Sequence, residues 1–104
     1  MQFAIIAYDG DDNEALNRRM AVRDQHIALS DQLLSSGNGL FGGAILDEES
    51  RMVGTVKIVQ FDTEEEFQKY MDSEPFVTGG VWKNIEVLPF KMGPSYKKLY
   101  RDDT

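Results

Sequence analysis

The segment GLFGGAILDEESRMVGTVKIVQF, residues 39 to 61, decides the fold, because it holds two strand-like runs with no helix between them. GLFGGAIL (39–46) is an apolar run with a glycine-rich middle, and RMVGTVKIVQF (51–61) alternates in part. The polar residues DEES separate the two runs as a turn. We therefore expect two consecutive strands at the centre of the chain.

The regions on either side of this segment each contain one strand and one helix. QFAIIAY (2–8) reads as a buried strand, and residues 13–36 have a helical pattern that ends at Gly37. After the central segment, Asp62 or Thr63 caps a helix through residue 73, and VWKNIEVLPF (81–90) reads as the last strand. With right-handed crossovers, the order βαββαβ predicts an α+β, ferredoxin-like fold: a four-stranded antiparallel sheet with two helices on one face.

This fold leaves one face of the sheet without a cover, because the chain has only two long helical segments. We therefore expect a homodimer, in which a second copy covers that face. Residues 1–92 form the single predicted domain, and residues 93–104 form a polar tail.

The composition narrows the possible partners. The formal net charge of −7 argues against a nucleic-acid partner. No apolar stretch approaches the roughly 20 residues that span a bilayer, so we expect no membrane contact. Cysteine is absent, which fits a cytoplasmic protein without thiolate chemistry. A small molecule is the better candidate for a ligand.

The first helix carries polar side chains where apolar ones are expected. At about 100° per residue, the apolar half of the helix contains Leu16, Met20, Val22, Ile27, Leu29, Leu33 and Leu34. Within that half, one stripe at spacings i, i+4, i+7 and i+11 contains Arg19, Arg23, His26 and Ser30.

Two interpretations of this stripe stay open. In the first, the arginine stems cover the sheet edge and His26 is a hydrogen-bonded structural histidine. In the second, the stripe lines a cleft, with His26 as acid or base and an arginine holding an anionic group. Ser30 lies one turn beyond His26, but a nucleophilic serine also needs an acid that orients the imidazole.

The sequence does not support a cofactor or metal site. Gly37, Gly39 and Gly42 match G-x-G-x-x-G, but they lie between a helix and a following strand, whereas a dinucleotide site needs the reverse order. One histidine and no cysteine give no constellation typical of zinc or iron. We therefore expect neither a metal nor an organic cofactor.

Three short motifs can be read together: Arg23-Asp24-Gln25-His26, Leu40 to Gly43, and Glu74-Pro75-Phe76 followed by Gly79-Gly80-Val81. In order and spacing they resemble the YciI-like family, with its R-x-x-H and D-P-[YF]-x-x-x-G-[VL] patterns, over roughly residues 2 to 91. The resemblance implies a dimeric α+β barrel and an active-site pair, here His26 and Glu74. The chain departs by having glutamate for the usual aspartate and Gly42-Gly43 for a common glycine-proline pair.

The first hypothesis for function is a cofactor-independent enzyme that transfers a proton on a small metabolite, in lyase-, isomerase- or dehalogenase-like chemistry. His26 would be the acid or base, and Glu74 would fix its tautomer. The residues expected to contact substrate are Arg19, Arg23, Tyr8, Gly43 and Phe76, with Trp82 as further wall surface. The alternatives are a non-catalytic ligand-binding or regulatory homodimer, and a structural subunit whose polar stripe solvates a dimer seam.

Overall fold

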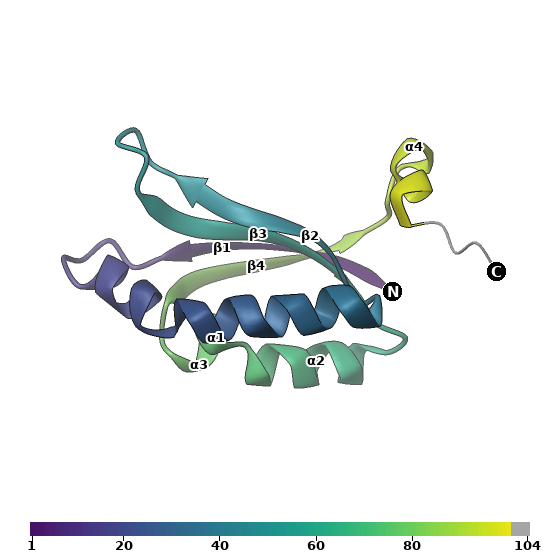
Figure 1. The fold of residues 1–104 in the computed structure, drawn as a ribbon, viewed down its shortest axis with the longest axis horizontal. Coiled ribbons are helices and arrows are strands. Elements are labelled where there is room, and N and C mark those ends of the chain that lie inside the picture. The colour runs from purple at the N-terminus through teal and green to yellow at the C-terminus, as the bar shows by residue number, and fades with distance from the viewer. Residues whose placement is uncertain (101–104) are drawn as a thin grey trace.

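The computed structural model describes residues 1–100, and its main elements follow the predicted order (Figure 1). The strands are β1 (Gln2–Asp9), β2 (Gly39–Leu46), β3 (Met52–Gln60) and β4 (Trp82–Phe90). The long helices are α1 (Ala15–Ser36) and α2 (Glu64–Ser73). Two short helices, α3 (Pro75–Thr78) and α4 (Pro94–Lys97), and a 3-10 turn, Lys98–Tyr100, were not predicted.

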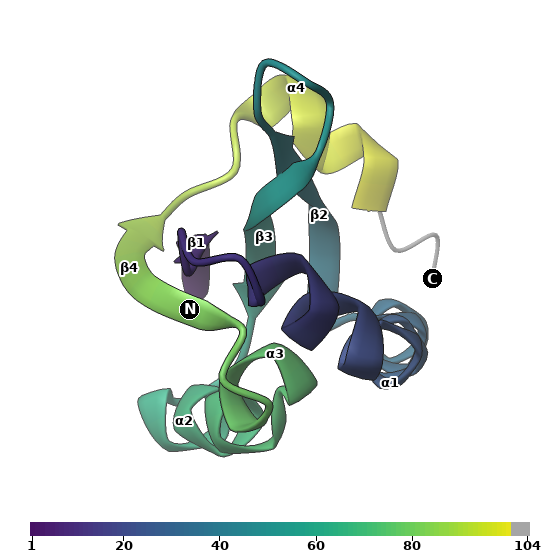
Figure 2. The same cartoon turned by 90° about the vertical axis from the view of Figure 1, so that its left-hand side faces the viewer.

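The four strands form one antiparallel sheet in the order β2-β3-β1-β4. Ile5 in the centre of β1 pairs with Lys57 on β3 and with Val87 on β4, which fixes the register of the three strands. Both crossovers pass through helices on the same face of the sheet (Figure 2). This arrangement confirms the ferredoxin-like α+β prediction.

The ends of the helices follow local chemistry. Gly37 ends α1 in the left-handed conformation, with φ of 84°, as predicted. Thr63 caps α2 by accepting a hydrogen bond from the Glu66 amide. These two residues therefore set where each long helix meets the sheet.

The hydrophobic core lies between the sheet and helices α1, α2 and α3. Its buried members are Phe3, Ile5, Ala7, Leu33, Val59, Phe61, Phe67, Tyr70, Met71, Phe76, Val81 and Trp82. Three of them, Phe67, Tyr70 and Met71, come from one face of α2 at spacings i, i+3 and i+4. Helix α1, although it is 22 residues long, contributes only Leu33 to this set.

Helix α1 turns its polar stripe, rather than most of its apolar residues, toward the sheet. Arg19 is buried, and Arg23, His26 and Ser30 are partly buried. The exposed apolar residues of this helix are Leu16, Met20, Ile27 and Leu34. The expectation that these four face the core was wrong. Arg19 and His26 of the stripe contact the buried carboxylates of Asp9 and Glu74, and a buried charge needs such partners.

The opposite face of the sheet is largely uncovered. Helices α1, α2 and α3 lie on one face, and α4 stands beyond one end of the sheet (Figures 1 and 2). Alternation along the strands directs large apolar side chains to the uncovered face, and Tyr8, Val56, Leu88 and Phe90 are exposed there. An exposed apolar face of this kind is typical of a protein contact surface.

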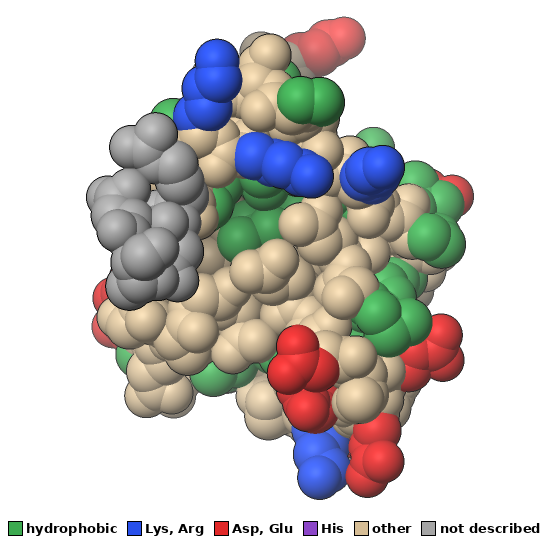
Figure 3. Space-filling view, turned by 90° about the vertical axis from the view of Figure 1, so that its right-hand side faces the viewer, with side chains coloured by type: hydrophobic (Ala, Val, Ile, Leu, Met, Phe, Trp, Pro, Cys, Tyr) green, Lys and Arg blue, Asp and Glu red, His purple; other side chains and the backbone are tan. Residues whose placement is uncertain are grey.

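The tail from Gly93 is ordered through Tyr100, whose hydroxyl donates a hydrogen bond to the Leu40 carbonyl. The rest of the predicted tail lies outside the described residues. Seen from this end, basic side chains lie along the upper edge of a hollow with a hydrophobic floor, and most acidic ones lie lower, on the α2 side (Figure 3). Within residues 1–100, no helix is long and apolar enough to span a bilayer.

Candidate active site

Glu74 stands at the junction of α2 and α3, and Pro75 explains its conformation. A residue before proline avoids the helical region, and Glu74 has an extended backbone with φ of −65° and ψ of 120°. Helix α2 therefore ends at Ser73, and Pro75 begins α3, where no amide hydrogen is needed. The Glu74 carboxylate turns back to accept a hydrogen bond from the Phe76 amide. The acid-proline pair thus directs a carboxylate into the interior.

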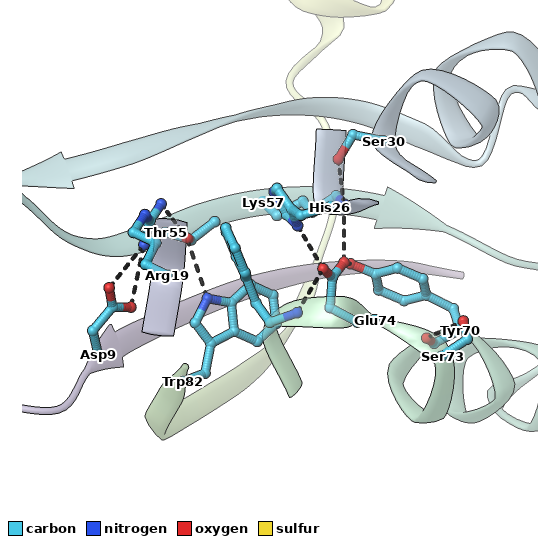
Figure 4. Close-up of polar contacts among 11 residues, drawn as sticks. Asp9, Arg19, His26, Ser30, Thr55, Lys57, Tyr70, Ser73, Glu74 and Trp82 are labelled. Atoms are coloured by element: carbon cyan, nitrogen blue, oxygen red, sulfur yellow. Dashed lines mark hydrogen bonds and ion pairs between the residues drawn. The ribbon is translucent and has the colours of Figure 1, made fainter. Parts of the chain in front are cut away.

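Donors surround both carboxylate oxygens of Glu74 (Figure 4). Oε1 contacts His26 Nδ1 at 2.5 Å and the Phe76 amide nitrogen at 3.2 Å. Oε2 accepts from the Tyr70 hydroxyl at 2.6 Å and from Lys57 Nζ at 3.4 Å. The side chain of Glu74 is 0% exposed. The additional methylene of glutamate therefore does not prevent contact with His26.

These donors set the charge of the cluster. Burial alone would raise the pKa of Glu74, but the His26 hydrogen bond, the Lys57 charge and the Tyr70 hydrogen bond outweigh it and lower that pKa. Burial lowers the pKa of Lys57, and Glu74 opposes that change. Burial, together with the negative charge of Glu74, raises the pKa of Tyr70. At neutral pH, an ionised Glu74 therefore lies beside a neutral Tyr70.

His26 lies between this buried cluster and the solvent. Its ring stacks on Phe76, with the ring centroids 3.8 Å apart and an angle of 11° between the planes. The edge of Trp82 lies near the imidazole at 6.4 Å between centroids. The His26 side chain is 14% exposed. A neutral imidazole that donates its Nδ1 hydrogen to a carboxylate carries its free lone pair on Nε2.

A cavity of about 410 Å³ opens between α1 and strands β2 and β3. This volume is within the range of small-molecule sites. Gly42 and Gly43 contribute no side chains to the β2 wall. The lining residues are Arg19, Arg23, His26, Ile27, Ser30, Asp31, Leu34, Gly39, Leu40, Phe41, Gly42, Gly43, Ala44, Met52, Thr55, Lys57 and Phe76. The polar stripe of α1 therefore lines one wall of the cavity.

Arg19 occupies a second buried polar cluster at the other end of the stripe. Its Nη1 lies 3.0 Å from Asp9 Oδ2, and its Nη2 donates to Thr55 Oγ1 at 3.2 Å. Trp82 Nε1 donates to the same Thr55 oxygen at 3.2 Å. The guanidinium also lies over the Phe76 ring, at 4.7 Å from its centroid. The charge of Arg19 is therefore balanced by Asp9 inside the protein.

The structure brings together some of the predicted site residues and separates others. Arg19, Arg23, His26, Gly43 and Phe76 line the cavity, and Glu74 lies behind His26. Tyr8 does not line it, because alternation along β1 directs its side chain to the opposite face of the sheet. Trp82 is buried behind Phe76 and His26.

Sequence reasoning missed two residues that contact Glu74. Lys57 lies in the partly alternating run at 51–61 and Tyr70 lies in the predicted helix that ends at residue 73, but neither was assigned to the site. The available signal was a lysine in the middle of an apolar strand run, VKIV (56–59).

Among residues 1–100, no group of three or more His, Cys, Asp or Glu side chains is placed to hold a metal ion.

Comparison with known proteins places this chain in a family. Residues 1–91 match the YCII-related domain. The chain belongs to the YCII-related domain family. It is 34% identical over 97 residues to an uncharacterised protein of Haemophilus influenzae, covering 88% of this chain and 97% of that protein. It is 29% identical over 92 residues to Protein YciI of Escherichia coli O6:H1, covering 83% and 94%.

A solved structure shows the same YCII-like fold. It is 5-chloro-2-hydroxyhydroquinone dehydrochlorinase from Burkholderia phenoliruptrix AC1100, in complex with 2,5-dihydroxybenzoquinone. The superposition has a TM-score of 0.75 at 22% sequence identity, and it covers 91% of this chain and 98% of the dehydrochlorinase. This likeness confirms the fold class of the YCII-related domain in this chain.

Proposed function

We propose that the chain is a cofactor-independent enzyme that transfers a proton on a small anionic molecule, with His26 as the general acid or base. The observation that carries this proposal is the pair of His26 and Glu74, 2.5 Å apart, with the imidazole at the wall of a cavity. Histidine is the side chain whose ordinary pKa suits proton transfer near neutral pH. A carboxylate on Nδ1 holds such a ring in one tautomer and supports the imidazolium that forms.

Glu74 has a positioning role in this scheme. Its carboxylate is fully buried and its oxygens are occupied by donors, so it acts on substrate only through His26. Lys57 lies 3.4 Å from the other oxygen of Glu74 and offsets its negative charge. The lone pair on Nε2 is then the base that faces the ligand.

Arg23 is the proposed anchor for an anionic group. It lines the cavity on the same stripe as His26, and it forms no ion pair within residues 1–100. Arg19 lines the cavity as well, but Asp9 already balances its charge. A guanidinium matches the geometry of a carboxylate or of paired oxygens on a ring. Gly43 would let the ligand approach the backbone of β2.

The dehydrochlorinase supports a hydroxylated ring as one class of substrate. That protein was solved with 2,5-dihydroxybenzoquinone, and the cavity of this chain is lined by Phe76 and His26, whose rings stack on each other, and by Arg23. Elimination and isomerisation on such rings both need a proton acceptor, the role proposed for His26.

A non-catalytic ligand-binding or regulatory protein is the second candidate. The small exposed fraction of His26, 14%, and its stacking on Phe76 favour it, because a ring held in this way also makes a rigid binding wall. Both candidates use the same cavity, so only turnover separates them.

The proposed assembly is a homodimer in which the uncovered face of the sheet is buried against a second copy. Val56 and Leu88 lie exposed on that face. Light scattering should give twice the chain mass, and Leu88→Glu should give the mass of one chain. A monomeric parent protein at about 100 μM would contradict the dimer, since stable interfaces commonly reach submicromolar dissociation constants.

The test of the enzyme proposal begins with a thermal-shift screen of hydroxylated benzoquinones, dihydroxybenzoates and 2-oxo acids. Compounds that bind are then followed by NMR in deuterated buffer for proton exchange or elimination. His26→Gln should abolish turnover while binding survives, whereas Gln25→Ala, on the exposed face of the same helix, should leave both unchanged. Binding without turnover in the parent protein would favour the second candidate.

A further inference from the structure

Ser30 and Lys57 form a polar pair at the cavity, and the scheme proposed for His26 gives Ser30 no role. Lys57 Nζ donates a hydrogen bond to Ser30 Oγ at 3.0 Å, and the same ammonium contacts Glu74 Oε2 at 3.4 Å (Figure 4). Both residues line the cavity. An ammonium has only donor hydrogens, so the Ser30 oxygen is the acceptor in this contact.

That direction leaves the Ser30 hydroxyl with a hydrogen to donate. Within residues 1–100, this hydroxyl has no acceptor for its own hydrogen. The positive charge of Lys57 on the Ser30 oxygen polarises the hydroxyl and strengthens it as a donor. Ser30 follows His26 by four residues on α1, so the two side chains lie one above the other on the same face. A hydrogen-bond donor thus lies one helical turn from the imidazole.

We infer that Ser30 is a second catalytic residue, which donates a hydrogen bond to a carbonyl oxygen of the substrate while His26 removes a proton from the neighbouring carbon. Lys57 is a positioning residue that acts through Ser30. This inference rests on the proposed function and adds a substrate class to it: small carbonyl compounds that carry an anionic group and an acidic C–H beside the carbonyl. Arg23 is the anchor for the anionic group.

The step balances without any co-reactant. His26 Nε2 accepts the proton, the C–H electron pair becomes a carbon–carbon double bond, and the carbonyl π pair moves to oxygen. The enolate oxygen then carries the negative charge and accepts the hydrogen bond from Ser30. Return of a proton to the same carbon gives exchange, and its return to another atom of the enolate gives isomerisation. Donors aimed at the developing charge contribute more in the transition state than in the ground state.

Phenylpyruvate is the probe for this inference, because it carries a carboxylate, a ketone and an acidic C–H on one small molecule. The full chain is mixed with phenylpyruvate in deuterated buffer, and exchange at the carbon beside the ketone is followed by NMR. Loss of one oxyanion donor costs about 100-fold or more in kcat, so Ser30→Ala should lower kcat by that factor with little change in KM. The control Ser35→Ala, an exposed serine on the same helix, should stay within about 2-fold, the range of surface changes.

Lys57→Met should also slow exchange in the parent background, and it should slow exchange by a smaller factor in the Ser30→Ala background, where only its contact with Glu74 is left to lose, since coupled residues are not additive. If Lys57→Met lacks native circular dichroism, Lys57→Arg takes its place in the same cycle. Independent losses for the two residues would overturn the link between them.

The outcomes separate this inference from the proposed function. Unchanged exchange in Ser30→Ala with loss in His26→Gln would overturn the role of Ser30 and leave His26 as the base. No acceleration by the parent protein would overturn this substrate class, and turnover of a compound from the wider screen would still support the proposed function.

Discussion

Replacement of Glu74 by glutamine changes one atom of the cluster and removes its only negative charge. In the parent chain, the two oxygens accept from His26, Tyr70, the Phe76 amide and Lys57. In Glu74→Gln, an amide group would face donors on one side, and the Lys57 ammonium would remain buried without a counter-charge. Removal of one member of a buried ion pair costs about 3–5 kcal/mol.

That cost is large relative to the stability of the chain. A domain of this size has a free energy of unfolding of about 5–15 kcal/mol. A loss of 3–5 kcal/mol should therefore lower the melting temperature by well over about 10 °C, at roughly 4–8 °C per kcal/mol. Urea unfolding followed by circular dichroism measures the loss, at fixed protein concentration because a dimer is more stable when concentrated.

Glu48→Gln is the matched control for this prediction. Glu48 lies exposed in the β2–β3 turn and makes no ion pair within residues 1–100. Its replacement should change the free energy of unfolding by less than about 0.5 kcal/mol. A loss below about 1 kcal/mol in Glu74→Gln, within the range of an ordinary hydrogen bond, would refute the view that the buried carboxylate is ionised and held by Lys57.

The remaining predictions concern pH and the buried pairs. Glu74 has a lowered pKa in the folded chain, so in acid the unfolded chain binds more protons than the folded chain. The stabilisation of the folded chain by ionised Glu74 should therefore be present above about pH 4.3 and be lost as pH falls through the lowered pKa. In urea titrations at acid pH, Glu74→Gln should lack this loss of stability. Tyr70 has a raised pKa, so the folded chain binds more protons above about pH 10 and stability should fall there; a parent protein no more sensitive to alkali than Tyr70→Phe would contradict this. Asp9→Asn should cost about 3–5 kcal/mol because Arg19 stays buried without its partner, whereas Asp12→Asn, in a surface pair, should change the urea midpoint little; equal effects would argue against the burial of the Asp9 pair.

The fold could be predicted because its signals are local. The hairpin at 39–61, the stop at Gly37 and the proline at 75 each act over a few residues, and their order leaves few topologies. The short helix α3 was missed because a single turn has little periodicity to detect, and Pro75 signalled only the end of α2.

The candidate pair could also be proposed before the structure, but its surroundings could not. The stripe on α1 and the acid before Pro75 pointed to His26 and Glu74 through spacing and family resemblance. Lys57 was not found, because alternation in β3 makes Val56 and Ile58 look like the inward residues. The structure shows the reverse: Thr55, Lys57 and Val59 face the helices.

The sequence by itself determined the order of the elements, the helix ends and the presence of a polar stripe on an apolar helix face, since each depends on neighbouring residues. The tertiary structure decided which face of α1 and of β3 turns inward. That choice depends on contacts between distant segments, because a buried charge is stable only where another segment supplies its partner. Glu74 receives hydrogen bonds from α1, β3 and α2 together, and no pattern within one of these elements specifies that meeting point.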